Sequence, residues 1–250
     1  MKLKFIIIIL FSVFFSELIF SAPKIILKLD DLSVKNGVCQ CLPVMDYLVQ
    51  KQLKAGFGII ASKNDNSVLF ALTPYLKAKN PKNEALFEIW HHGLDHIKPE
   101  FQGTGYDYQK SHFEEADQQI KKLLGIQMHT FGTPFNASDS VTNIVITENS
   151  DYKVFMYSSI KPKQSNGILY LDHRVNMENG TGKPEFDFFV ENYNKSKANY
   201  QDYIILQGHP GQWTPEKLEQ FKKIIDFLIS EGCEFVKPYE YYLSKKRNEK

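Results

Sequence analysis

The sequence predicts an α/β protein, a distorted (β/α) barrel of about seven strands. First, short apolar runs rich in β-branched residues alternate with amphipathic segments along roughly 225 residues, as in chains that form a parallel sheet covered by helices. Second, at 250 residues, of which 43% are hydrophobic, the chain is long enough to bury one full core. Third, polar and titratable residues follow several of the expected strands, which is where barrel enzymes place their chemistry.

The first half of the chain favours the order strand, helix, strand, helix, strand. The opening strand is a short β-branched run that stops at Asp30 and Asp31. The first helix has Pro43 near its start and Gly56 at its end, positions that these residues favour. The expected elements are a strand over 24–29, a helix over 43–56, a strand over 57–62, a helix over 67–79 and a strand over 85–90.

The second half repeats this alternation. Gly125 closes a charged amphipathic helix, and Pro134 breaks the strand that follows. Thr214 as N-cap and Pro215 at the first helical position begin the most regular helix of the chain. The expected elements are helices over 112–125, 138–150, 186–200 and 214–232, and strands over 126–135, 152–159, 167–171, 203–210 and 234–242.

Residues 1–22 differ from the rest and are predicted to be a signal peptide that precedes one catalytic domain over 23–250. A lysine-containing start is followed by an almost wholly apolar run over 5–20 and then by small residues. Pro23 and Phe20 fit a cleavage site poorly, so an uncleaved N-terminal anchor is the alternative. In either case we expect the domain to be secreted, periplasmic or at the cell surface.

Composition excludes some partners. Lys+Arg number 30 against 29 Asp+Glu, and a net charge of +1 argues against a nucleic-acid-binding surface. No tight protein partner is implied either. The three cysteines, Cys39, Cys41 and Cys233, are odd in number and lack the spacing of a zinc knot. We interpret them as structural or incidental, with a disulfide from Cys233 to one of the other two left open.

Histidines and carboxylates gather where the predicted strands end. His92 and His96 are four residues apart, which on a helical turn would place both imidazoles on one side, close enough to share a cation. Asp31 or Asp30 would complete a set of two histidines and one carboxylate with positions left open for water and substrate, as a hydrolytic metal site needs. His209 ends a late strand and would open onto the same face.

These stretches resemble the motifs of the polysaccharide deacetylases of the NodB homology type, which are metal-dependent carbohydrate esterases. "LKLDD" resembles the first motif, whose first aspartate, here Asp30, is the catalytic base and whose second, Asp31, binds the metal. "HGLDH" fits the second motif, H-[ST]-x-x-H, in its two metal histidines, His92 and His96, with Gly93 where the family prefers Ser or Thr. "FGTPF" resembles the third, R-x-P-[YF], and "ILQGHP" resembles the last, whose histidine, His209, is the catalytic acid.

The resemblance spans residues 24–242 and implies a cofactor and a reaction. It implies a divalent cation, most simply Zn²⁺, that binds a water and the acetyl carbonyl oxygen of an acetylated glycan. Asp30 would take the proton of the attacking water, and His209 would protonate the leaving nitrogen. A backbone N–H near Phe135 would stabilise the oxyanion. The same site is able to hydrolyse an N-acetyl amide or an O-acetyl ester.

Two departures from the family pattern bear on the site. Gly132 stands where the third motif has an arginine, which in the family pairs with the catalytic aspartate, so either the site works differently or another cation orients Asp30. We predict that Arg174 does so and rank Lys28 below it, because strand alternation leaves Lys28 one layer deeper in the barrel. The fourth motif, D-x-x-D-W, is not recognisable, and Glu178 lies in about the right region as a second candidate for orienting the base.

Aromatic residues near the metal histidines suggest a wall on which a sugar ring stacks. We predict that Trp213, Trp90 and the glycine-rich segment 101–109 contribute to it, although Trp90 lies in a strand pattern and is at least as well explained as core.

Two other function classes stay open at this point. One is a non-catalytic carbohydrate-binding protein on a deacetylase frame, which the absence of the third-motif arginine invites; the presence of both Asp30 and His209 speaks against it. The other is a two-carboxylate glycoside hydrolase using Asp30 and Glu178, in which the histidine pair would have no role.

Overall fold

The computed structural model describes residues 22–161, 166–196 and 202–248. The predicted signal peptide lies, apart from Ala22, outside these ranges. Within them, no helix combines the length and the apolar character needed to cross a bilayer.

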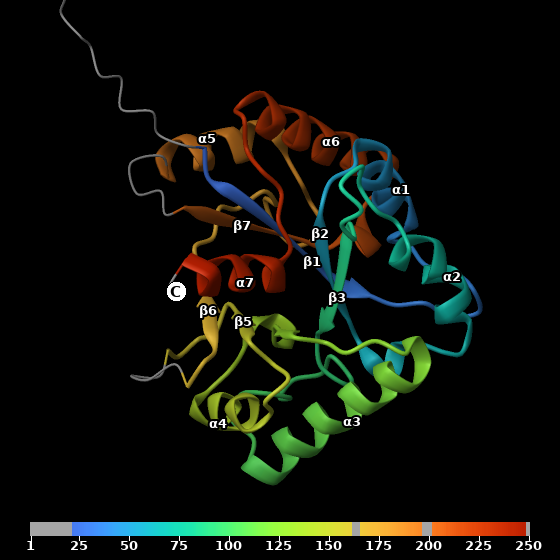
Figure 1. Cartoon of the computed structure of the whole chain (residues 1–250), viewed down its shortest axis with the longest axis vertical. Coiled ribbons are helices and arrows are strands. Elements are labelled where there is room, and N and C mark those ends of the chain that lie inside the picture. Colours follow the sequence, from blue (N-terminus) through green and yellow to red (C-terminus); the bar gives the residue numbers. More distant parts are fainter. Residues whose placement is uncertain (1–21, 162–165, 197–201, 249–250) are drawn as a thin grey trace, which may run out of the picture.

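Strands and helices alternate along the chain, as predicted (Figure 1). The strands are β1 (Lys24–Leu32), β2 (Ala55–Ile59), β3 (Phe87–His91), β4 (Thr130–Phe131), β5 (Val154–Met156), β6 (Leu169–Leu171) and β7 (Tyr203–Gly208). The α-helices are α1 (Leu42–Lys51), α2 (Ser67–Leu76), α3 (Tyr106–Leu124), α4 (Ser140–Glu148), α5 (Phe186–Ser196), α6 (Pro215–Ser230) and α7 (Pro238–Asn248). Short 3₁₀ turns lie at Ala61–Lys63, Pro134–Asn136 and Pro210–Gln212.

The seven strands form one parallel sheet in the order β6-β5-β4-β3-β2-β1-β7, which confirms the predicted barrel. The segment after β6 nearly closes the ring. Ile205 in β7 donates its N–H to the carbonyl of His173 at 2.8 Å, and Val175 donates back to the carbonyl of Ile205 at 3.1 Å. Because all strands run the same way, their carboxyl ends meet at one end of the barrel.

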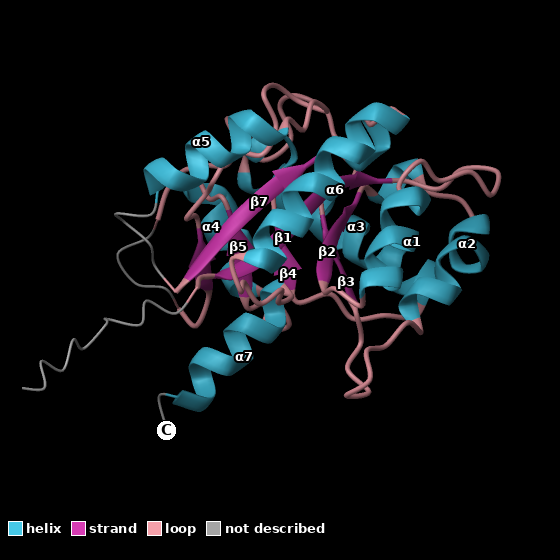
Figure 2. Ribbon diagram, turned by 90° about the horizontal axis from the view of Figure 1, so that it is seen from above, coloured by secondary structure: helices cyan, strands magenta, loops and turns pink. Residues whose placement is uncertain are grey.

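Apolar cores fill both sides of the strands. The larger core lies between strands and helices and includes Leu48, Phe113 and Phe221. Figure 2 shows helices on the outer side of the strands. The smaller core fills the barrel interior, with Trp90 and Ile205 among its members. Since strand side chains alternate between two directions, strands such as β1, β3, β5 and β7 supply residues to both cores.

Three glycines make room for the Trp90 indole inside the barrel. A Cβ atom at Gly58 would lie 2.3 Å from Cη2 of this ring, one at Gly132 would lie 2.9 Å from Cζ3, and one at Gly56 would lie 3.1 Å from Cδ1. Gly56, which was predicted to end the first helix, therefore lies in β2. That helix instead ends at Lys51, followed by Gln52 in the left-handed conformation with φ of 58°.

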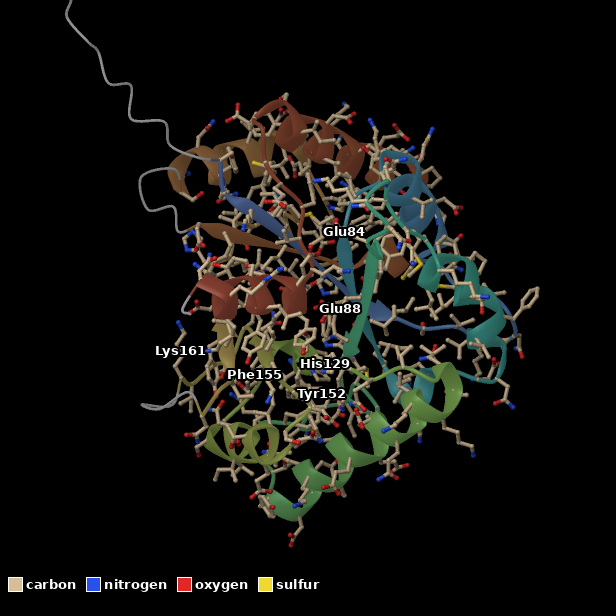
Figure 3. All side chains as sticks on the ribbon, viewed as in Figure 1. Glu84, Glu88, His129, Tyr152, Phe155 and Lys161 are labelled. Carbon is tan, nitrogen blue, oxygen red and sulfur yellow. The ribbon has the colours of Figure 1, made fainter. Side chains whose placement is uncertain are left out.

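Helix α7 covers the end of the barrel at which the strands begin. Its Tyr239 donates its backbone N–H to Glu88 of β3 at 2.9 Å and stacks on His129 with ring centroids 4.1 Å apart. Glu88 and His129 are labelled in Figure 3. The predicted final strand over 234–242 is wrong beyond a single bridge from Phe235 to β1. Pro238 begins the helix, because its fixed φ and missing N–H suit the first turn.

Candidate metal centre and active site

A bulge at the end of β1 directs two neighbouring aspartates to one site. In a regular strand, Asp30 and Asp31 would point in opposite directions. The pairing of β1 with β2 shifts between Leu29 and Leu32, and Asp31 takes the left-handed conformation with φ of 67°. Aspartate tolerates this conformation better than most residues do. Asp30 therefore stays inside the barrel, while Asp31 faces the loop after β3.

Asp31, His92 and His96 lie together at this loop. Oδ1 of Asp31 is 3.3 Å from Nε2 of His92 and 3.1 Å from Nε2 of His96, and the three potential ligand atoms all lie within 4.8 Å of one another. Oδ1 is buried and has no well-oriented hydrogen-bond partner in the described part of the chain, which suits an atom that binds a cation. Two imidazoles and one carboxylate are a donor set that zinc and related divalent ions favour.

Both charge and orientation of these ligands suit a cation. Burial opposes ionisation of Asp31, but the imidazoles of His92 and His96 lower the pKa of its carboxyl group well below the ordinary value. His92 donates from Nδ1 to the carbonyl of Gly132 at 2.7 Å, which leaves its Nε2 unprotonated and facing Asp31 when the ring is neutral.

The segment that joins the two histidines is an irregular loop rather than the helical turn predicted from their spacing. Gly93 and His96 have positive φ values of 83° and 56°. Glu100, which sequence reasoning missed, holds the loop by accepting hydrogen bonds from three consecutive N–H groups, including that of His96 at 2.9 Å. A Cβ at Gly93 would lie 2.9 Å from Oε1 of Glu100 and 2.6 Å from Pro134, so both space and backbone require glycine there.

Asp30 pairs with Lys28, and the prediction that Arg174 orients it is wrong. Nζ of Lys28 lies 2.8 and 2.6 Å from the two carboxylate oxygens, and Gln207 donates from Nε2 to Oδ2 at 2.6 Å. Arg174 is exposed, and its guanidinium lies 5.5 Å from the centre of the Tyr157 ring. Two residues of a strand rise only about 6.6 Å, a distance that the four-carbon stem of a lysine spans.

His209 follows β7 directly and is held by Glu178. Its Nδ1 donates to Oε2 of Glu178 at 2.7 Å, its backbone N–H donates to Oε1 at 2.9 Å, and its Nε2 lies 4.0 Å from Oδ2 of Asp30. Burial opposes protonation of His209, but the hydrogen bond to Glu178 and the charge of Asp30 raise the pKa of the imidazole above its ordinary value. The prediction that Glu178 orients the base is therefore wrong, since it supports the histidine.

Glu178 is fully occupied by donors. Beyond the two from His209, it accepts hydrogen bonds from Nε1 of Trp213 at 2.8 Å and from the N–H of Gly182 at 3.1 Å. With four N–H groups around it, this carboxyl group has no free position from which to protonate a glycosidic oxygen, which counts against the two-carboxylate glycoside hydrolase. Trp213 is half-buried and packs on Phe221, so its observed contact is with Glu178, and its role toward a substrate stays a prediction.

Cavities flank the metal centre on two sides. One of about 450 Å³ is lined by residues that include Asp31, His96 and Cys41. Another of about 540 Å³ is lined by Phe135 and Lys98, among others. The Phe135 ring is 44% exposed and lies 4.3 Å from the His96 imidazole, centre to centre. Cavities of this size are typical of sites for small molecules or for single units of a polymer.

Several residues singled out in the sequence lie in the core instead. Trp90 is fully buried in the barrel and Phe101, at the start of segment 101–109, is buried as well, so the predicted sugar wall is wrong at these two positions. Cys39, Cys41 and Cys233 form no disulfide with one another, which leaves the disulfide alternative without support in the structure.

Comparisons with known proteins find a match in structure only. No family model and no curated protein matches the sequence. Among solved structures, a family 4 acetyl xylan esterase from Clostridium thermocellum, in complex with a cobalt ion, matches with a TM-score of 0.64 and 17% identity, covering 89% of this chain and 92% of that one. The Xyl-CE4 domain of a multidomain xylanase from the hindgut metagenome of Trinervitermes trinervoides matches with a TM-score of 0.62 and 18% identity, covering 90% and 92%.

A protein described as a CE4 family pseudoenzyme, from Bacillus anthracis, also matches, with a TM-score of 0.58 and 14% identity. The match covers 88% of this chain but 66% of the pseudoenzyme. Identities this low establish the architecture and leave the chemistry to the residues of the site. The chain therefore has the fold of the CE4 carbohydrate esterases, and its resemblance to the polysaccharide deacetylases is confirmed at the level of the fold.

Proposed function

We propose that this protein is a metal-dependent hydrolase that removes N-acetyl groups, or O-acetyl groups, from a carbohydrate polymer or oligosaccharide. The observation that carries the proposal is the convergence of Asp31, His92 and His96 beside a separate carboxylate–imidazole pair, Asp30 and His209. A carbohydrate-binding protein would need no such pairing of a base with an acid. The name of one structural neighbour, a family 4 acetyl xylan esterase in complex with a cobalt ion, agrees with this proposal.

Asp30 and His209 are the proposed base and acid. Asp30 would accept a proton from the attacking water, and Nε2 of His209 would donate one to the leaving nitrogen or oxygen. The raised pKa of His209 favours the protonated form that an acid needs. The 4.0 Å between Nε2 and Oδ2 of Asp30 supports this assignment, because it would let both groups act on one acetyl carbon.

A divalent cation held by Asp31, His92 and His96 would supply Lewis-acid chemistry, polarising the acetyl carbonyl and making water more acidic. Zinc suits this set, because catalytic zinc sites use three protein ligands and keep a position open. The N–H of Phe135, at the positive-φ centre of its turn, is the proposed donor to the oxyanion.

The 540 Å³ cavity, with the exposed Phe135 ring at its edge, would take a sugar unit next to the acetylated one. We also propose export, as the predicted signal peptide implies; such a protein would meet glycans at the cell surface or outside the cell.

Acetate release tests the proposal. The full chain is incubated with N-acetylglucosamine oligomers and with acetylated xylan, with and without a chelator. We expect acetate release that the chelator abolishes and a divalent ion restores, and a loss of at least about 100-fold in His92→Ala. His129→Ala is the matched control, because this histidine lies at the opposite end of the barrel, and it should keep wild-type activity. Release that is unaffected by both the chelator and His92→Ala would contradict metal-dependent catalysis.

A further inference from the structure

We infer that Lys28 is the positioning residue for Asp30, so that a lysine from β1 supplies the cation that holds the proposed base. This inference rests on the proposed function. Both side chains are almost fully buried, with 0% of Lys28 and 2% of Asp30 exposed. Nζ contacts both carboxylate oxygens, at 2.8 and 2.6 Å, which fixes the plane as well as the place of the carboxylate.

Lys28 is itself fixed on several sides. Its Nζ lies 5.0 Å from the centre of the Trp90 ring and 5.2 Å from that of Tyr157, within range of cation–π attraction. The amide oxygen of Asn136 lies 3.3 Å away. Burial lowers the pKa of the Lys28 ammonium, and the carboxylate of Asp30 works against this. A buried cation held by an anion and two rings has little freedom to move, so it acts as a rigid support.

Position 132 shows why this cation comes from β1. A Cβ atom there would lie 2.9 Å from the Trp90 ring and 3.4 Å from Cε of Lys28. Lys28 and Trp90 thus fill the space that a long side chain from position 132 would enter on its way to Asp30. Glycine at 132 and lysine at 28 are therefore two parts of one arrangement.

The arrangement leaves Asp30 aimed at the reaction site. Gln207 fixes Oδ2 from a second direction at 2.6 Å, and the same atom lies 3.8 Å from Nε2 of His92 and 4.0 Å from Nε2 of His209. Without Lys28, Asp30 would still lie at the end of β1, but its carboxylate would lose the two contacts that set its orientation. Misplacement of a base lowers the rate of the chemical step more than it lowers substrate affinity.

Lys28→Met, which keeps the length of the side chain and removes its charge, tests the inference in the full metal-loaded protein. We expect kcat for acetate release to fall by about 10- to 100-fold, with KM and bound metal nearly unchanged. Lys28→Arg, which restores a cation, should recover at least part of that loss. Lys54→Met is the matched control: this lysine is also buried in ion pairs, with Glu84 and Glu240, but away from the site, so kcat should stay at the wild-type value.

A double-mutant comparison separates positioning from general support of the fold. In an Asp30→Asn background, Lys28→Met should cost no further activity, because the group it positions is already lost. If Lys28→Met does not fold, Lys28→Gln, which keeps a donor without the charge, takes its place with the same expectation. Wild-type kcat in the folded variant, or an equal loss in the Asp30→Asn background, would overturn the inference. A wild-type protein that releases no acetate would instead overturn the proposed function, and this inference with it.

Discussion

Glu178 and Lys28 place opposite charges beside the proposed acid, His209, and the proposed base, Asp30. Glu178 lies against His209 and favours its protonated form, while Lys28 lies against Asp30 and compensates its negative charge. Acid–base catalysis by two groups requires such opposite states at one pH. A single side chain therefore supports each of the two proposed groups.

Glu178→Gln should narrow the pH range of activity on its alkaline side. His209 must be protonated to act as an acid, so activity falls as pH rises through its pKa. Burial alone would lower that pKa, and the contact with Glu178 helps to raise it. Removing the charge should therefore shift the alkaline limb of kcat/KM to lower pH. Glu185→Gln, on the same loop, is the control and should leave the limb in place. An unchanged limb in Glu178→Gln would refute this role.

Sequence reasoning could find the residues that carry motifs but not all of their supports. Asp31, His92 and His96 stand at spacings that suggest ligands, and the structure brings them together. Glu178 meets His209 across 31 positions of the chain, and no spacing signals that contact. The position of Lys28, two residues before Asp30 in one strand, did indicate that the two side chains lie on the same side of the strand. The sequence did not show that the lysine side chain is long enough to reach from its own layer of the barrel to the carboxylate.

At the scale of elements, the Trp90 indole of β3 packs against both β2 and the segment that follows β4. Trp90 of β3 lies against glycines of both neighbouring segments and under His92, with the two ring centres 5.0 Å apart. The position of the indole is thus linked to the position of a metal ligand. The sequence suggested that Gly56 ends a helix, because space for a distant ring leaves no local pattern.

Gly58→Ala should destabilise the barrel. The added methyl group would lie 2.3 Å from the Trp90 ring, so the indole or the strand must shift. We expect the free energy of unfolding, measured by urea denaturation, to fall by about 1–3 kcal/mol. Gly211→Ala, where the methyl group would meet nothing within 4 Å, should change it little. Equal free energies of unfolding in the two variants would contradict this expectation, because they would show that the Trp90 ring moves aside at little cost.

At the scale of the whole molecule, the candidate metal site and the helix that closes the barrel lie at opposite ends. Asp31 and the histidines gather at the carboxyl ends of the strands, and α7 covers the opposite opening. Seven of the eight strands expected from the alternation of apolar runs are present, and they form one parallel sheet. Helix α7 was not predicted, because aromatic residues such as Tyr239 are common in strands and the local sequence favours a strand there. Only the contact with the end of the barrel explains why this segment is a helix.

Tyr241→Ala should weaken the fold without altering the chemistry. Tyr241 of α7 is buried and donates its hydroxyl to Asp202 at 2.8 Å. Its loss should lower the free energy of unfolding by about 3–5 kcal/mol, the cost of removing a large buried ring. Leu243→Ala, on the same helix but 42% exposed, should cost less than about 1 kcal/mol. A fall in kcat below the unfolding temperature in Tyr241→Ala would argue that the two ends are coupled.

The amount of metal that the protein retains shows whether Asp31, His92 and His96 bind one divalent cation, as we propose. The full chain is purified from zinc-supplemented culture, dialysed, and measured by elemental analysis beside His96→Ala and the remote variant His129→Ala. We expect close to one equivalent of zinc per chain in the wild type and in His129→Ala, and a small fraction of that in His96→Ala. Wild-type protein without metal, or equal metal in all three, would contradict it.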